Sequence, residues 1–530
     1  MTVHTPTAEE LDGIDPKVYQ RRWAILATMC LSLVLIVATV SSVNVAIPAL
    51  SSSSLHPSAT QVLWIVDAYA LVFAALLLPA GAIGDRFGRK GALLVGLVIF
   101  AVASAACAFM KDTTALITCR AIMGIGAALI MPSTLSLLQS AFPRRERAKA
   151  IAMWAGFAGA GGAIGPVMGG LLEEHFWYGS VFFVAAPIAA VAFVASAILA
   201  PASKEPVAHK LDPIGSLLSI VGFAALLGAI IEGPERGWSD TFVVAGFVVS
   251  AVGLVGFVFY ERQATEPMLD MKFFHNRRFA MGSMGITVTF FAMFSLFFML
   301  TQFLQYVQGY TALQAGVRGI PFAVTMVIVS PRAPALSARI GAKKAVAGGM
   351  LVFVVGLAAF SRVEIGTSYW YVMVCLMLCA AGVAATMPSL SSGIVQSVPL
   401  HKAGVGSAVN DTTRELGGAI GIAVIGSIVN SIYRSHAAPA IDQLAAIPGL
   451  PADAVEATRL NIGAALRVVD GAQQQGVPAD VVDALRTQLR QSFVDGLHVA
   501  LLVGAGVALI GAVIMYIRLP DGGAHHEHNH

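Results

Sequence analysis

The sequence is poor in charge. Only 12% of its 530 residues are Asp, Glu, Lys or Arg, about half the share in an average soluble protein, whereas 57% are hydrophobic. It also lacks a polar stretch long enough for a large soluble domain. Apolar stretches of roughly 20 residues, each able to cross a hydrocarbon core of about 30 Å as a helix, follow one another along the chain. These features exclude a soluble protein and predict an all-α membrane protein.

Signatures of chemical catalysis are missing as well. The sequence has no HExxH motif, no nucleophile elbow and no Walker-type loop, so neither hydrolysis nor ATP use has a visible site. We therefore expect no enzyme activity, no cofactor, no metal site and no nucleic-acid partner. The cysteines all fall inside apolar stretches, which argues against a disulfide framework. They are Cys30, Cys107, Cys119, Cys375 and Cys379.

The apolar pattern predicts fourteen spans. Their expected starts are residues 23, 61, 91, 114, 149, 179, 212, 241, 279, 312, 342, 370, 402 and 496. The first span, residues 23–50, is too long for a signal-peptide core, so we expect it to be retained. A long connection at 435–495 precedes the last span and contains helix-like patches. We interpret it as an amphipathic surface helix, with a lid or a partner site as the alternative.

Lys and Arg concentrate in the short loops on one side of the predicted bundle. That side holds Lys17, Arg21, Arg22, Arg86, Arg89, Lys90, Arg144, Arg145, Arg147, Lys149, Arg277, Arg278, Arg339, Lys343 and Lys344. The opposite short loops hold only Lys111, Arg236 and Arg362. Because positive loops stay in the cytoplasm, we expect a multi-pass protein of the cell (inner) membrane with both termini cytoplasmic.

An internal repeat predicts the architecture. The segment GAALIMPSTLSLLQSAFP at residues 126–143 recurs as GVAATMPSLSSGIVQSVP at 382–399, a displacement of 256 residues. The same displacement relates GGAIG at 161–165 to GGAIG at 417–421. Spans 1 to 6 thus correspond to spans 9 to 14, with two spans inserted between them. Transporters are commonly built from such repeats, which rock around a site near the midplane.

The repeat divides the chain into segments. We expect a cytoplasmic tail (1–22), an N-terminal six-helix half (23–201), two inserted spans (212–261), a C-terminal six-helix half (279–518) and a His-rich cytoplasmic tail (519–530). The tail histidines, His525, His526, His528 and His530, could bind a metal adventitiously, but a disordered end is the simpler interpretation.

Several short motifs stand in the predicted loops and spans. The loop after span 2 reads GAIGDRFGRK at residues 81–90, and a degraded copy without the acidic residue, SARIGAKK, stands at 337–344. Span 5 carries GGAIGPVMGG at 161–170, similar to the antiporter motif, and span 4 carries RAIMG at 120–124. These motifs resemble those of the major facilitator superfamily. With NVAIP at 44–48 and WIVDAY at 64–69, the chain resembles its fourteen-span QacA/EmrB-type drug:proton antiporters.

The resemblance implies a major facilitator fold and proton-driven efflux of drugs, dyes and antiseptics. The candidate gating residues are those of the loop motif, namely Gly81, Asp85, Arg86, Gly88 and Arg89. The alternative is that the loop is basic only because of the positive-inside rule, which would explain its arginines but not Asp85 or its glycines. The antiporter helix contributes Gly161, Gly165, Pro166, Gly169 and Gly170, with generic membrane packing as the alternative. One departure is Thr39, which occupies a position where family members usually carry an acidic residue.

Ionisable residues inside spans are costly and need a reason, and here they are few. Asp411 and Glu415 are four residues apart, hence on one face of span 13, with Asp411 roughly 13 Å from the cytoplasmic end. Two carboxylates this close in a low dielectric resist simultaneous ionisation, which suits exchange of a proton against a cation. The alternative is a structural pair between Asp411 and Arg414, which would leave Glu415 without an obvious partner.

Three further charges lie inside spans. Asp67 is placed to attract a cation near the outer mouth, or is a hydrogen-bonded carboxyl at the interface. The resemblance assigns Arg120 to timing proton release, although a structural ion pair fits equally. Arg318 is not part of any family motif, and we interpret it as a structural partner.

Span 9 is rich in phenylalanine between residues 290 and 298, a surface suited to planar cations or to lipid. The predicted function is proton-coupled export of small lipophilic, often cationic compounds by a monomer in the lipid bilayer. A dedicated exporter of an endogenous metabolite or lipid is the alternative, and a transport-dead receptor or membrane enzyme is a third hypothesis.

Overall fold

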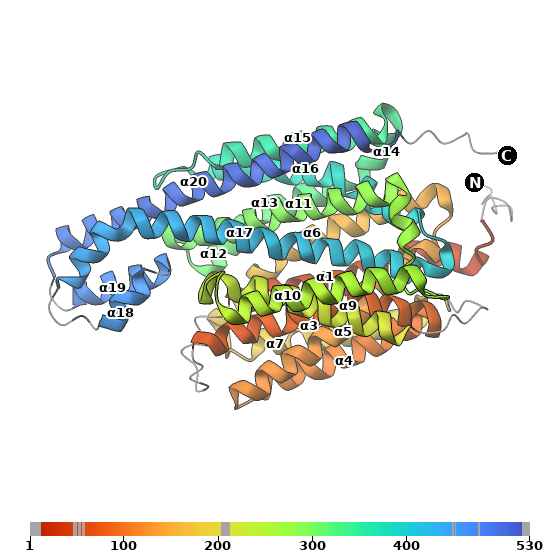
Figure 1. The fold of residues 1–530 in the computed structure, drawn as a ribbon, viewed down its shortest axis with the longest axis horizontal. Helices are drawn as coiled ribbons and strands as arrows, with labels where there is room; N and C mark the ends of the chain where they lie inside the picture. The colour runs from red at the N-terminus through yellow and green to blue at the C-terminus, as the bar shows by residue number, and fades with distance from the viewer. Residues whose placement is uncertain are drawn as a thin grey trace.

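The protein folds as a bundle of long helices in a computed structural model (Figure 1). The structure describes residues 12–45, 50, 55, 59–202, 212–447, 450, 452–459, 461–474 and 477–521. Part of the predicted span 1 motif, Ala46 to Pro48, and the tail histidines therefore lie outside the described residues. Within the described residues there is no β-strand, and fourteen helices are long and apolar enough to cross a membrane.

The first eight spans cover the N-terminal half and the insertion. They are α1 (Pro16–Val45), α3 (Ala59–Phe87), α4 (Arg89–Phe109), α5 (Thr113–Ala141), α6 (Arg144–His175), α7 and α8 (Ser180–Phe183 and Ala185–Leu199), α9 (Pro213–Arg236) and α10 (Thr241–Gln263). Local signals set several starts, because Asp112, Asp212 and Asp240 each cap a helix by accepting a backbone N–H of its first turn. The inserted helices α9 and α10 pack on each other, and α9 packs against α3 and α17.

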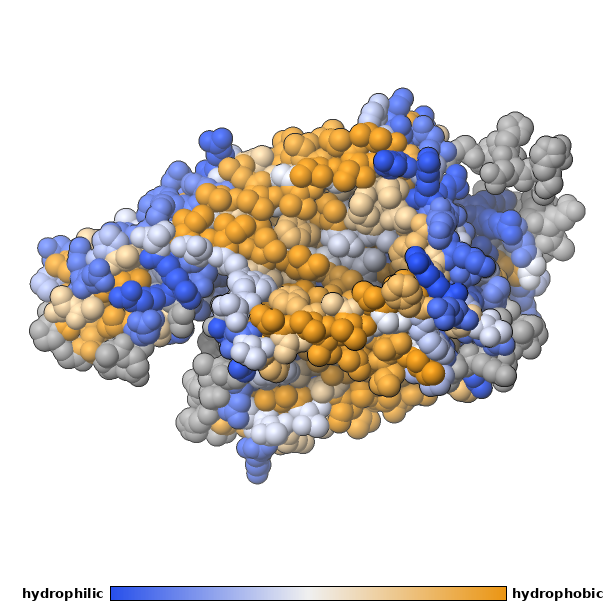
Figure 2. All heavy atoms as spheres, in the orientation of Figure 1, coloured by the Kyte–Doolittle hydropathy of each residue, from blue (hydrophilic) through white to orange (hydrophobic). Residues whose placement is uncertain are grey.

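The C-terminal half follows a short 3-10 turn, η1 (Met271–His275). Its elements are α11 with η2 (Arg277–Gln302 and Phe303–Val307), α12 (Ala312–Arg318), α13 (Ile320–Val329), η3 (Ser330–Arg332), α14 (Ala333–Ile340), α15 (Ala342–Phe360), α16 (Tyr369–Gln396), η4 (Leu400–Lys402), α17 (Ala403–Ala445), α18 (Ala452–Thr458), α19 (Ile462–Gln474) and α20 (Ala479–Arg518). Space-filling atoms show an apolar band over the middle of the bundle with hydrophilic residues towards both ends (Figure 2).

The internal repeat recurs as a repeated packing contact. In the N-terminal half, a Cβ added to Gly126 of α5 would lie 2.8 Å from the carbonyl oxygen of Gly96 in α4. In the C-terminal half, a Cβ added to Gly382 of α16 would lie 2.6 Å from the carbonyl oxygen of Gly349 in α15. Both helix pairs thus approach through facing glycines, as small residues allow in membranes. The fold thus confirms that the two halves are built from corresponding helices, as the sequence repeat predicts.

One end of the bundle, which we name the basic end, holds the start of α1, the α3–α4 turn and the starts of α6 and α17 (Figure 1). The opposite end, which we name the cap end, carries α18 and α19. There α17 and α20 continue as helices through much of the connection predicted at 435–495, so the last helix begins at Ala479 rather than near residue 496. The Tyr433 hydroxyl donates to Thr458 and the Arg490 guanidinium donates to the Tyr306 carbonyl, which fixes the cap to the bundle.

Candidate functional site

A buried polar cluster lies on α17, and we name it the α17 cluster: Asn410, Asp411, Thr412, Arg414 and Glu415. Asp411 is 1% exposed. Its Oδ1 lies 3.6 Å from Arg414 Nη1 and accepts a 3.0 Å hydrogen bond from the Asn410 amide. The ion pair between Asp411 and Arg414, which was one of the two alternatives from the sequence, is therefore present.

The pair does not satisfy the whole cluster. Asp411 Oδ2, Asn410 Oδ1, Thr412 Oγ1 and Arg414 Nε are buried and find no hydrogen-bond partner within the described part of the chain. Glu415, one turn after Asp411, is half-buried and forms no hydrogen bond or ion pair with any described residue. A buried polar atom left without a partner costs roughly 1–3 kcal/mol, and such atoms in a native structure often mark a functional site.

Arg414 reaches across the junction of the two halves. Its guanidinium carbon lies 4.7 Å from the ring centroid of Phe290 in α11 and 5.5 Å from that of Trp154 in α6. Trp154 is held in place because its indole N–H donates to the Thr134 hydroxyl of α5, at 3.2 Å. The α17 cluster thus faces aromatic rings from both halves, which suits cation–π contact with a cationic or planar molecule.

Arg120 and Tyr69 form a second buried group, in the N-terminal half. The Arg120 side chain is fully buried, and its Nε donates to the Ile65 carbonyl oxygen at 2.8 Å. The guanidinium carbon stands 4.5 Å from the Tyr69 ring centroid. Tyr69 is within electrostatic reach of both Arg120 and Glu415, so the fold brings these predicted residues together across the junction. Asp67 is half-buried and lies on α3, the helix that also carries Tyr69.

The α3–α4 turn joins the halves at the basic end. Asp85 accepts hydrogen bonds from the backbone N–H groups of Gly404 (2.8 Å) and Val405 (3.0 Å), at the start of α17. Arg89 forms a 3.0 Å ion pair with Asp85 and donates to the Leu400 carbonyl. A carboxylate at a helix N-terminus is favourable because unpaired N–H groups and the helix dipole both attract it. We name this arrangement the Asp85 latch.

Two glycines and an arginine complete the predicted loop motif. A Cβ added to Gly81 would lie 2.6 Å from the Gly404 carbonyl oxygen, so α3 and α17 meet here backbone to backbone. Gly88 adopts φ +104°, a conformation that side chains disfavour, and turns the chain into α4. Arg86 points to the ring of Phe87 and not into the latch.

The glycines of α6 serve two contacts. Gly161, Gly165 and Gly169 face α1, where added Cβ atoms would lie 2.5 to 3.0 Å from its atoms. Gly170 faces Leu313 of α12, and Gly316 of α12 packs on Pro166, so the antiporter helix also touches the other half. Thr39 of α1 is buried, and its hydroxyl donates to Leu35 within its own helix.

Other charges and rings fall in less central places. The Arg318 guanidinium carbon lies 3.5 Å from the Tyr310 ring centroid. Among the span 9 phenylalanines, Phe290 and Phe291 are buried whereas Phe298 is exposed. Arg332, an exposed arginine within span 10, is not among the predicted site residues, although any charge inside an apolar stretch is a signal. Trp154 is not among them either, because it contacts Arg414 from a position too distant in the sequence for a pattern to connect the two.

Two six-helix halves that meet around a buried polar cluster define a polytopic membrane transporter. A family model for the Major Facilitator Superfamily matches residues 29–422, and the chain belongs to this superfamily, as its motifs predicted. It is a secondary transporter and not an enzyme.

The chain resembles bacterial efflux proteins along nearly its whole length. It is 31% identical to the multidrug resistance protein Stp of Mycobacterium tuberculosis (strain CDC 1551 / Oshkosh), covering 88% of this chain and 86% of Stp. It is 33% identical to the multidrug efflux pump LfrA of Mycolicibacterium smegmatis, covering 93% and 96%. Among solved structures, the human organic anion transporter MFSD10 superposes with a TM-score of 0.58 at 13% identity, covering 93% and 99% of the two chains, a likeness of fold.

Proposed function

We propose that the protein is a proton-coupled antiporter that exports small lipophilic, often cationic drugs, dyes or antiseptics by alternating access. The observation that carries the proposal is the α17 cluster, with two carboxylates one helical turn apart at the junction of the halves and aromatic rings beside them. The names of Stp and LfrA support the class of substrate.

Exchange follows from competition for negative charge. Arg414 is the positive charge shared by Asp411 and Glu415, and one guanidinium cannot balance two ionised carboxylates, so ionising both is unfavourable in a low dielectric. Either a proton or a cationic substrate removes that cost, so the cluster needs only one of the two at a time. Binding of one therefore favours release of the other.

The Asp85 latch supports a direction for the cycle. Closed, it holds α3 to α17 at the basic end, and we infer that the site is then reached from the cap end. By the positive-inside rule we assign the basic end to the cytoplasm, with both termini cytoplasmic in the inner membrane. The site lies within a single chain, so we propose a monomer as the working unit, with Asp67 at the outer mouth.

A dedicated exporter of an endogenous metabolite or lipid is the second candidate. Thr39 favours it, because an uncharged, internally bonded hydroxyl stands where family members usually carry an acidic residue. A strain that lacks the gene and accumulates one native compound without drug sensitivity would establish this alternative.

The test is proton-gradient-driven uptake of ethidium into inverted vesicles. We expect Asp411→Asn and Glu415→Gln to lower the uptake rate at least tenfold, because each removes a proton-exchanging group. Asp442→Asn and Glu456→Gln are matched controls, since both side chains are more than 70% exposed in the cap, and should transport normally. If both cluster variants keep the wild-type rate, coupling lies elsewhere; if the wild type takes up no ethidium, the dedicated exporter becomes the leading candidate.

A further inference from the structure

Span 10 presents one continuous face to the lipid. Val317, Ile320, Val324 and Ile328 are each 41% to 50% exposed and follow one another at helical spacing along α12 and α13. The same stripe continues towards the basic end through Arg332, Leu336 and Arg339, all exposed. Because the stripe is apolar over most of its length, its surroundings are acyl chains and not a water-filled cavity.

Two arginines therefore stand on a lipid-facing surface. Arg332 lies about 12 Å from the end of the span at Ile340, and Arg339 lies two turns further on, at the end of the span. Neither forms an ion pair with any described residue, and the acceptor of the Arg332 guanidinium is the Ile328 carbonyl. An unpaired guanidinium at this depth is costly and calls for an anionic partner.

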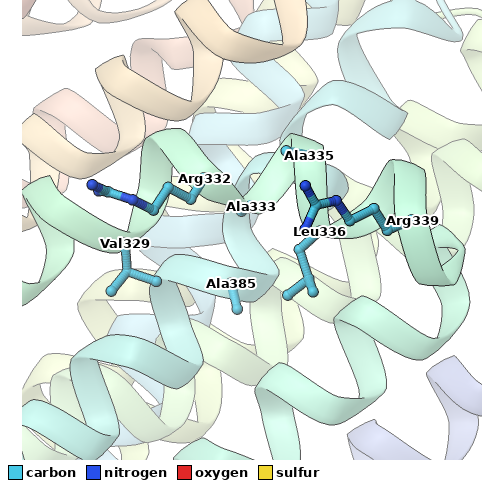
Figure 3. A pocket seen from close by; sticks show the side chains of 7 residues that line it. All are labelled: Val329, Arg332, Ala333, Ala335, Leu336, Arg339 and Ala385. Atoms are coloured by element: carbon cyan, nitrogen blue, oxygen red, sulfur yellow. The ribbon is translucent and has the colours of Figure 1, made fainter.

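The arginines border a groove of about 410 Å³ between span 10 and α16. In Figure 3 the side chains of Val329 and Leu336 flank Ala385 of α16, and the two arginine side chains lie along the other edge. Pro331 and Pro334, on either side of Arg332, remove two backbone donors, and the 3-10 turn η3 interrupts the helix here. The groove thus combines an apolar floor with a cationic edge.

We propose that this groove binds an anionic phospholipid in the leaflet at the basic end, with its phosphate on Arg339 at the end of the span and an acyl chain along Leu336, Ala385 and Val329 towards Arg332. Arginine is suited to phosphate because its fork of donors matches the phosphate oxygens. An apolar groove with a cationic rim fits a molecule with one charged end and one apolar end, whereas free phosphate would leave the floor empty.

The site adjoins the junction of the halves. Ser330, two residues before Arg332, donates to the Ala152 carbonyl of α6 at 2.6 Å. A bound lipid therefore rests on the segment of span 10 that contacts the N-terminal half.

The experiment is a binding titration of the full chain in detergent, followed by native mass spectrometry. The probes are phosphatidylglycerol and phosphatidylcholine with identical acyl chains, with inorganic phosphate as competitor. We expect phosphatidylglycerol to bind about tenfold more tightly than phosphatidylcholine, and Arg332→Ala/Arg339→Ala to abolish that preference. Arg362→Ala, an exposed arginine near the cap end, is the matched control and should keep it.

Each other outcome overturns the proposal. Equal binding of the two lipids by the wild type removes the charge recognition, and a double variant that keeps the preference moves the lipid elsewhere. Competition by millimolar inorganic phosphate would make the site a phosphate site. The single variant Arg339→Ala, at the exposed helix end, keeps the test decisive if the double variant does not fold, because it should lose several-fold of the preference.

Discussion

The two copies of the loop motif share a backbone turn but not a function. In the first copy Gly88 adopts φ +104°, and in the second Gly341 adopts φ +87°, each just before the next helix begins. Three residues before the glycine, the first copy has Asp85 and the second has Ala338. Only the first therefore has a carboxylate that bonds the other half, at Gly404 and Val405.

The second contact between the halves is made differently. α6 and α13 meet through close packing of Gly156 and Gly159 against Met326, and through the hydrogen bond from Ser330 to Ala152. The junction of the halves thus has one ionic latch at the basic end and one packed contact deeper in the bundle. The lesson is that a repeat can preserve backbone geometry, which many sequences satisfy, while a single carboxylate makes the two contacts chemically unequal.

The largest effect is expected from breaking the latch itself. Asp85→Asn replaces an acceptor oxygen with an NH₂ group that faces backbone N–H donors, so ethidium transport should fall at least tenfold, through loss of a charged hydrogen bond worth about 1.5–3 kcal/mol. Asp240→Asn is the matched control, because asparagine caps a helix as well as aspartate does. Normal transport by Asp85→Asn would show that the latch is dispensable.

A smaller effect should come from separating the backbones beside the latch. Gly81→Ala places a Cβ 2.6 Å from the Gly404 carbonyl oxygen, so α3 and α17 must move apart and the transport rate should fall several-fold. Gly91→Ala, in the neighbouring helix α4 with no atom within 4 Å of the new Cβ, should be neutral. Equal rates for both variants would mean that close approach at Gly81 is not needed for transport.

The two positive-φ glycines should respond alike. Gly88→Ala and Gly341→Ala each force a side chain into an unfavourable backbone region, at a cost of roughly 1–3 kcal/mol. The apparent melting temperatures of both variants in detergent should fall by similar amounts. A loss confined to Gly88→Ala would show that only the first turn is under conformational constraint.

The smallest effect is expected from giving the second copy a carboxylate. Ala338 is exposed, so Ala338→Asp should fold and transport at close to the wild-type rate. The double variant Asp85→Asn/Ala338→Asp should remain as impaired as Asp85→Asn in the ethidium assay. Recovery of transport would mean that the two contacts are interchangeable after all.

The sequence was sufficient for the spans and the repeat, because hydropathy and glycine spacing are local properties. It predicted helix-like patches in the 435–495 connection but started the last span near residue 496, because the charged residues between Asp480 and Arg490 do not belong in a membrane span. In the structure the two form one helix, α20, which packs on α19 and is joined to it by the Arg486–Asp470 ion pair. For the site, spacing along one helix predicted the Asp411–Arg414 pair as one of two alternatives. The rings beside Arg414 could not be predicted, since Trp154 reaches it only through the tertiary fold.

The helix α17 has a mechanical consequence. Its 43 residues make it about 65 Å long, roughly twice the thickness of the hydrocarbon core, and it carries the α17 cluster, the Asp85 contact and the support of the cap on one axis. If the helix tilts as a rigid rod by about ten degrees, a point about 30 Å beyond the pivot moves by roughly 5 Å. The part of α17 before Pro439 therefore amplifies small rotations, and a distance probe at the exposed Arg434 would report small angular changes in the membrane as larger displacements near the cap.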